Sequence, residues 1–114
     1  MLVVQGCQTT GEDTITKKDP EKAVKVRTQL AAEYIRTGDL DAAKRSLDQA
    51  LEADSRDSTA NMMMGVLLQQ EGSKISLEKA DHYFKRAISS DSKNAQARNN
   101  YGTYLFVTER YNDA

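Results

Sequence analysis

Residues 24–37 carry apolar and small side chains at the spacing of an amphipathic helix. Leu30, Ala31 and Tyr34 fall at i, i+1 and i+4, which places them on one face. Gly38 follows directly, and a glycine just past the last helical residue is a common helix end. The pattern therefore predicts a helix over 24–37.

A second helix is predicted after this glycine. Ala43, Leu47 and Ala50 recur at i, i+4 and i+7, so they line one face. Asp39 precedes them and is expected to cap the helix by accepting from exposed backbone N–H groups. Asp19 stands before Pro20 and is expected to cap the chain's first helix in the same way, because proline is favoured at the first helical position.

The two-helix pattern repeats along the chain with a period of 34 residues. Ala31 corresponds to Gly65 after 34 residues, and Gly65 corresponds to Gly102 after 37. In the second helices, Ala43 corresponds to Ala80 after 37 residues. An ordinary helical bundle also shows i, i+4, i+7 spacing, but the joint recurrence of glycine, alanine and aromatic positions favours a repeat.

Three extra residues are needed in the second unit, and we expect them between Gly72 and Ala80. They should lengthen the turn at 72–76, with Ser76 capping the following helix. The third unit reaches only the first turn of its expected second helix at 110–114. Because repeats bury their cores against neighbours, we expect residues 101–114 to fray or to self-associate.

These spacings resemble the tetratricopeptide repeat (TPR). The shared elements are Leu-Ala-x-x-Tyr at 30–34, Met-Gly-x-x-Leu at 64–68, the following glycine, and Ala-x3-Leu/Phe-x2-Ala. The resemblance implies an all-α fold, a right-handed superhelix of antiparallel helix pairs with a concave groove. It places a first repeat at 23–57, a second at 58–94 and an incomplete third at 95–114.

Two family positions are altered. Arg27, Asn61 and Arg98 stand where the repeat usually has an aromatic residue. Ser55 and Ser92 stand where a proline usually ends the unit.

The composition argues against several classes of function. The formal net charge is −1, so no excess of basic residues is present to bind the phosphates of a nucleic acid. One cysteine and one histidine, His82, supply neither a disulfide nor the usual ligands of zinc, and no partnered nucleophile stands beside His82. We therefore expect no catalytic residues, no metal, no cofactor and no small-molecule substrate. No apolar run reaches the ~18 residues of a membrane-spanning helix.

The N-terminus resembles the end of a bacterial lipoprotein signal peptide. Leu2, Val3 and Val4 would end the apolar run, Gly6 supplies the small residue, and Cys7 would be cut and acylated. Residues 1–6 are then a signal-peptide remnant, and the polar stretch at 7–22 is a flexible tether. An acyl anchor on Cys7 would tie the protein to a membrane. Gln8, which is not acidic, favours the outer membrane.

The order of these features is similar to that of the lipoproteins of type IV pilus biogenesis, of the PilF or PilW pilotin type. A lipoprotein cysteine is followed by a polar tether and then by TPRs, and the stretches Asp-Ser-Lys-Asn-Ala at 91–95 and Asn-Asn-Tyr-Gly at 99–102 add local likeness. The resemblance implies a non-catalytic scaffold of the bacterial cell envelope. It would be anchored at the periplasmic face of the outer membrane and would bind subunits of the pilus secretin.

The resemblance also implies a partner-binding groove on the first helix of each unit. An apolar strip with a polar fringe there would suit an amphipathic helix or an extended peptide. We expect Met62 in the groove, Met64 in the core and Met63 between units. The expected groove residues are Thr28, Ala32, Ile35, Met62, Val66, Gln69, Asn99, Thr103 and Phe106.

Three other functions fit the same sequence less well or less specifically. A cytosolic adaptor that clamps a peptide carboxylate would need basic residues in the groove, but the comparable positions carry Thr28, Ala32, Met63, Gln96 and Asn100. An enzyme with a TPR appendage is disfavoured by the lipoprotein-like start. A TPR lipoprotein of another envelope assembly machine is the main alternative.

Overall fold

The computed structural model describes the chain from Asp19 to Asp113, with side chains as far as Glu109. Cys7 and the rest of the expected tether up to residue 18 lie outside the described residues. Every regular element in the described range is a helix, which agrees with the all-α fold predicted from the sequence. The helices are α2 (Pro20–Thr37), α3 (Leu40–Ala53), α4 (Ser58–Glu71), α5 (Lys74–Ser90) and α6 (Ala95–Asp113).

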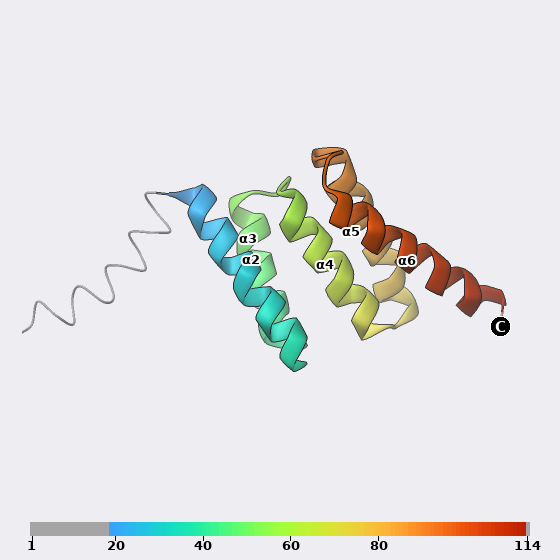
Figure 1. The fold of residues 1–114 in the computed structure, drawn as a ribbon. Coiled ribbons are helices and arrows are strands. Elements are labelled where there is room, and N and C mark those ends of the chain that lie inside the picture. The colour runs from blue at the N-terminus through green and yellow to red at the C-terminus, as the bar shows by residue number, and fades with distance from the viewer. Residues whose placement is uncertain (1–18, 114) are drawn as a thin grey trace, which may run out of the picture.

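The helices form two layers (Figure 1). α2, α4 and α6 lie side by side in one layer, and α3 and α5 lie behind them. α2 pairs with α3 and α4 pairs with α5, while α4 also contacts α2, α3 and α6. α4 is therefore the central helix of the described part of the chain.

Aspartates begin the first three helices by satisfying backbone donors that a helix leaves unpaired. The carboxylate of Asp19 accepts from the N–H of Lys22 at 3.0 Å, as expected for a cap ahead of Pro20. Asp39 accepts in the same way from the N–H of Ala42 at 3.2 Å, and Asp57 accepts from the N–H of Ala60 at 2.8 Å. Because α2 begins at Pro20, its first turn lies inside the stretch 7–22 that the sequence assigned to the tether.

Gly38 and Gly72 end α2 and α4 in the left-handed region, with φ of 87° and 77°. Residues with a side chain rarely adopt this conformation, so glycine is required for each two-residue turn. The predicted role of Gly38 is confirmed.

The three extra residues of the second unit do not lengthen its turn. α5 begins at Lys74, three residues ahead of Leu77, which corresponds to the first residue of α3. Ser73 is the cap, accepting from the N–H of Ser76 at 3.0 Å, so the expectation that Ser76 caps α5 is wrong. The insertion adds one helical turn, because a capping serine already precedes residues 74–76, which contain neither glycine nor proline.

α6 also differs from the sequence expectation. It runs without a break to Asp113, whereas a second helix was expected to start near residue 110. The residue corresponding to Gly38 and Gly72 is Glu109, which favours helix continuation over a left-handed turn.

The core lies between the two layers and depends on small residues where helices approach closely. Ala31, Ala43 and Ala80 are fully buried. At Gly65 an added Cβ would lie only 2.9 Å from the ring of Phe84, which is itself fully buried. The small residues of the first two units therefore mark helix–helix contacts, and Gly65 leaves room for the ring.

Two of the three polar residues at the family's aromatic position, Asn61 and Arg98, make the same kind of hydrogen bond. The amide of Asn61 donates to the carbonyl of Ser55 at 3.1 Å, and the guanidinium of Arg98 donates to the carbonyl of Ser92 at 2.6 Å. Each donor stands six residues after its acceptor. The two altered positions of the repeat thus interact with each other and fix the turns before α4 and α6.

Three aromatic rings join α5 to α6. The ring of Phe84 lies 5.8 Å from that of Tyr101 and 5.5 Å from that of Tyr104, and the two tyrosine rings stack at 5.9 Å. Tyr104 donates to the backbone carbonyl of Leu77, and Tyr101 donates to the carboxylate of Asp81 at 2.7 Å. The phenol groups are therefore hydrogen-bonded at the edge of an apolar contact.

The bond between Tyr101 and Asp81 predicts an alkaline titration. Burial, and then the hydrogen bond to Asp81, raise the pKa of Tyr101 from 10.0 to about 12. Because the pKa is higher in the folded state, the stabilisation is complete below pH ~10, the unfolded value, and is lost as pH rises through about 12. We expect Tyr101→Phe to remove one phenolate transition near pH 12 from an absorbance titration.

Tyr83→Phe is the matched control, since Tyr83 packs against Arg86 and is not bonded to Asp81. A transition at pH 10.0 or below that disappears in Tyr101→Phe would contradict the bond.

Candidate partner-binding groove

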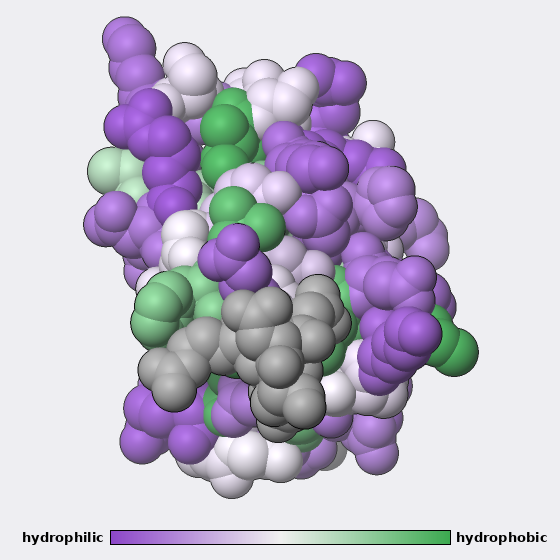
Figure 2. Space-filling view, turned by 90° about the vertical axis from the view of Figure 1, so that its right-hand side faces the viewer, coloured by the Kyte–Doolittle hydropathy of each residue, from purple (hydrophilic) through white to green (hydrophobic). Residues whose placement is uncertain are grey.

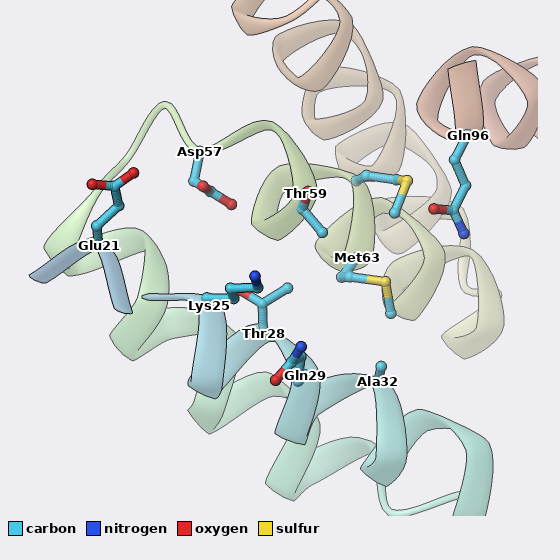
Figure 3. Close-up of a pocket in the computed structure, with 10 residues that line it drawn as sticks. Glu21, Lys25, Thr28, Gln29, Ala32, Asp57, Thr59, Met63 and Gln96 are labelled. Carbon is cyan, nitrogen blue, oxygen red and sulfur yellow. The ribbon is translucent and has the colours of Figure 1, made fainter. Parts of the chain in front are cut away.

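A hollow of about 460 Å³ opens between α2, α4 and the start of α6 (Figure 3). Met62 and Met63 of α4 and Ala32 of α2 form its apolar part. Gln29 and Gln96 lie on opposite sides of Met63, on α2 and α6. The remaining lining residues are polar or charged: Glu21, Lys25, Thr28, Asp57 and Thr59.

A second hollow of about 280 Å³ lies further along α4. Val66, Gln69 and Gln70 line it from α4, one to two turns beyond Met62, and Asn100 and Thr103 line it from α6. We call the two hollows together the groove. Since both are lined only by α2, α4, α6 and their caps, the groove belongs to the layer of first helices, as the TPR resemblance implies.

The structure places six of the nine expected groove residues in these hollows. Ala32 and Thr103 are exposed, Val66 and Gln69 are half-buried, and Thr28 and Met62 are buried at the base. Thr28 uses its hydroxyl within α2, donating to the carbonyl of Val24 at 2.7 Å. It therefore offers a partner little hydrogen-bonding capacity.

The other three expected residues lie elsewhere. Ile35 is 8% exposed and belongs to the core, because it shares the inner face of α2 with Val24 and Ala31 at i+11 and i+4. Asn99 and Phe106 are exposed on α6 but line neither hollow. The face of α6 that meets the groove carries residues 96, 100 and 103 instead.

The three consecutive methionines match the places predicted for them only in part. Met64 is 2% exposed and lies in the core, as predicted. Met62 is equally buried, so it forms the base of the first hollow rather than an open surface. Met63 is half-buried and faces the hollow from α4, which makes it the accessible methionine of the groove.

Nine lining residues were not predicted as groove residues, and four of them carry carboxamides. Gln29, Gln70, Gln96 and Asn100 stand next to residues that were predicted or at the next turn of the same helix. For Gln96 and Asn100 the comparison with a carboxylate-clamping adaptor already pointed to the groove. For Gln29 and Gln70 the periodicity of their neighbours was the available signal, because polar residues on a helix are usually assigned to solvent.

Charge is unevenly distributed over the groove. Glu21, Lys25 and Asp57 lie together at one end of the first hollow, near the N-terminal ends of α2 and α4. None of the five residues lining the second hollow is charged. The groove is therefore mostly neutral in a chain of which 29% is charged.

The described residues contain no cluster of three or more metal-ligating His, Cys, Asp or Glu side chains. No helix among the residues described is both long and apolar enough to cross a bilayer. Seen from the α6 end, the apolar surface is divided into separate patches among polar side chains (Figure 2).

Residues 24–57 match the tetratricopeptide repeat family, which coincides with most of α2 and with α3 and the following turn. A solved structure of pilF from Pseudomonas aeruginosa superposes on 82% of the chain with a TM-score of 0.73 and 33% sequence identity. Residues 24–57 therefore form a tetratricopeptide repeat, and the chain shares the fold of that structure. The all-α TPR fold predicted from the spacing of small residues is thereby confirmed.

Comparison of sequences also finds PilF. The type IV pilus assembly protein PilF of Pseudomonas aeruginosa is 34% identical over 111 residues, which is 96% of this TPR chain and 43% of PilF. An uncharacterized protein of Haemophilus influenzae is 28% identical over 94 residues, covering 82% of the chain and 51% of that protein. The chain is homologous to PilF over nearly its whole length and spans about half or less of these relatives.

Proposed function

We propose that this chain is a non-catalytic scaffold that supports type IV pilus assembly by binding subunits of the pilus secretin in its groove. The observation that carries the proposal is the likeness to PilF, at 34% identity over 96% of the chain. The matched region contains the layer of α2, α4 and α6 that forms the groove. TPR domains use such surfaces to bind other proteins, and the groove offers an apolar base with polar sides.

The proposal includes a lipid anchor on Cys7 at the periplasmic face of the outer membrane. It is supported by the sequence alone, namely the small and apolar residues before the cysteine and the polar stretch after it. Acyl chains add about 0.8 kcal/mol of membrane affinity per buried methylene, so several chains would hold the scaffold firmly.

The anchor is tested by metabolic labelling with palmitate in cells that express the gene product, beside its Cys7→Ser variant. We expect label in the wild type and none in the variant. Equal label in both, or none in either, would contradict the anchor while leaving secretin binding to its own test.

Secretin assembly is tested in cells that lack the gene. We expect the amount of assembled secretin in the outer membrane to fall, and the wild-type gene to restore it. Met63→Glu places a charge in the half-buried floor of the groove and should fail to restore assembly, whereas Lys44→Glu, an exposed change on α3, should succeed.

Unchanged secretin assembly in the absence of the gene would contradict the proposal. Loss of a different envelope assembly in the same cells would instead favour the alternative, a TPR lipoprotein that serves another machine.

A further inference from the structure

We infer that the groove binds an extended, uncharged peptide segment chiefly through the peptide's backbone. This inference rests on the proposed function of the groove, but it names the chemistry of the bound segment, which the likeness to PilF does not supply. The sequence left open whether the partner would be an amphipathic helix or an extended peptide.

Five carboxamide side chains supply the main observation. They lie on all three helices of the groove layer: Gln29 on α2, Gln69 and Gln70 on α4, and Gln96 and Asn100 on α6. Gln29 and Gln96 lie on either side of Met63 (Figure 3). The groove is therefore lined with amides from both sides of its apolar base.

These carboxamides are not used to hold the fold. Within residues 19–109 none of the five makes a side-chain hydrogen bond to the rest of the chain. Other amides of the same chain do, since Asn61 donates to Ser55 and Asn94 donates to Ser58. The groove amides thus keep both a donor and an acceptor available to a partner.

A carboxamide matches a peptide unit, because each carries one N–H donor side and one carbonyl acceptor. An extended peptide exposes both groups along its length. A helical partner has already paired its backbone internally and would leave the groove amides unsatisfied on binding. The amide lining therefore favours an extended segment.

The lining of the groove also indicates which side chains the bound peptide can carry. The second hollow has no charged lining residue, so a charged side chain bound there would lose water without gaining a counter-charge. Met63 and Val66 are half-buried and present apolar surface one turn apart along α4. Methionine adapts to side chains of different shape, so the segment can carry varied apolar residues.

The inference is tested by panning a displayed library of short random peptides on the purified chain. We expect enriched peptides to be poor in Lys, Arg, Asp and Glu. Their affinity should change little between about 50 mM and about 500 mM salt, since no exposed ion pair is involved. Methylating single backbone nitrogens of the best peptide should weaken binding about tenfold at each paired position.

Near-isosteric variants identify the groove amides. Gln69→Met and Asn100→Leu keep the size of each side chain and remove its hydrogen-bonding groups, so each should weaken peptide binding about tenfold. Asn99→Leu makes the same chemical change one residue away on α6, at an exposed position outside both hollows, and should leave peptide affinity unchanged.

Enrichment of charged or helical peptides, insensitivity to backbone methylation, or absence of any enriched peptide would overturn the inference. Secretin assembly in cells is measured independently of these peptides. A peptide result against backbone recognition would therefore leave the proposed role in secretin assembly standing. Unchanged secretin assembly would likewise leave open how the groove binds a peptide.

Discussion

Replacing Phe84 by alanine should lower the free energy of unfolding by about 3–5 kcal/mol, the usual cost of deleting a fully buried phenylalanine. The ring is fully buried and is the largest completely buried side chain of the described core. It fills the space over Gly65 of α4 and contacts the rings of Tyr101 and Tyr104. Its removal leaves a cavity where three helices meet, and chemical denaturation measures the loss.

Ile75→Ala is the control for this change. Ile75 lies on the same helix but is 67% exposed, so its truncation should alter the free energy of unfolding by less than ~0.5 kcal/mol. Similar losses in the two variants would show that Phe84 does not join α4, α5 and α6 as described.

Alanine at Gly65 and alanine at Gly102 should have opposite effects, although the two glycines are equivalent in the repeat. At Gly65 the new methyl would lie 2.9 Å from the buried ring of Phe84. Overpacking of this kind costs roughly 1–3 kcal/mol, which outweighs a gain in helix propensity of up to about 1 kcal/mol. At Gly102 nothing lies within 4 Å, so the propensity gain of about 1 kcal/mol should remain.

Thermal and chemical denaturation of both variants measure this difference. A stabilised Gly65→Ala variant would mean that Phe84 can move aside. A destabilised Gly102→Ala variant would mean that α6 has a packed neighbour at this position.

The fold could be predicted from the sequence because a TPR encodes its close helix contacts in small residues. The 34-residue step between Ala31 and Gly65 and the turn glycine at 38 locate the first helix pair, and Asp19 and Asp39 mark helix starts. These signals depend on local backbone chemistry and on a few close contacts, so they are visible without the structure. The three-residue insertion was located correctly but misinterpreted, because spacing alone does not distinguish a longer turn from a longer helix.

The groove was harder to predict, because a helix face has a direction that only packing fixes. Ile35 was expected in the groove with Thr28 and Ala32, but the pairing of α2 with α3 and α4 places it in the core. The amides of Gln29 and Gln96 come from helices far apart in the sequence, and no period connects them. Their juxtaposition appears only once α2, α4 and α6 are placed side by side.

Photo-crosslinking from the groove in living cells tests the central claim most directly. A photoreactive amino acid would replace Met63 or Thr103, one in each hollow, or Lys44 on α3 as the control position. The account predicts crosslinks to the secretin subunit from positions 63 and 103 and none from position 44. No secretin crosslink from either groove position, or equal crosslinking from Lys44, would contradict it.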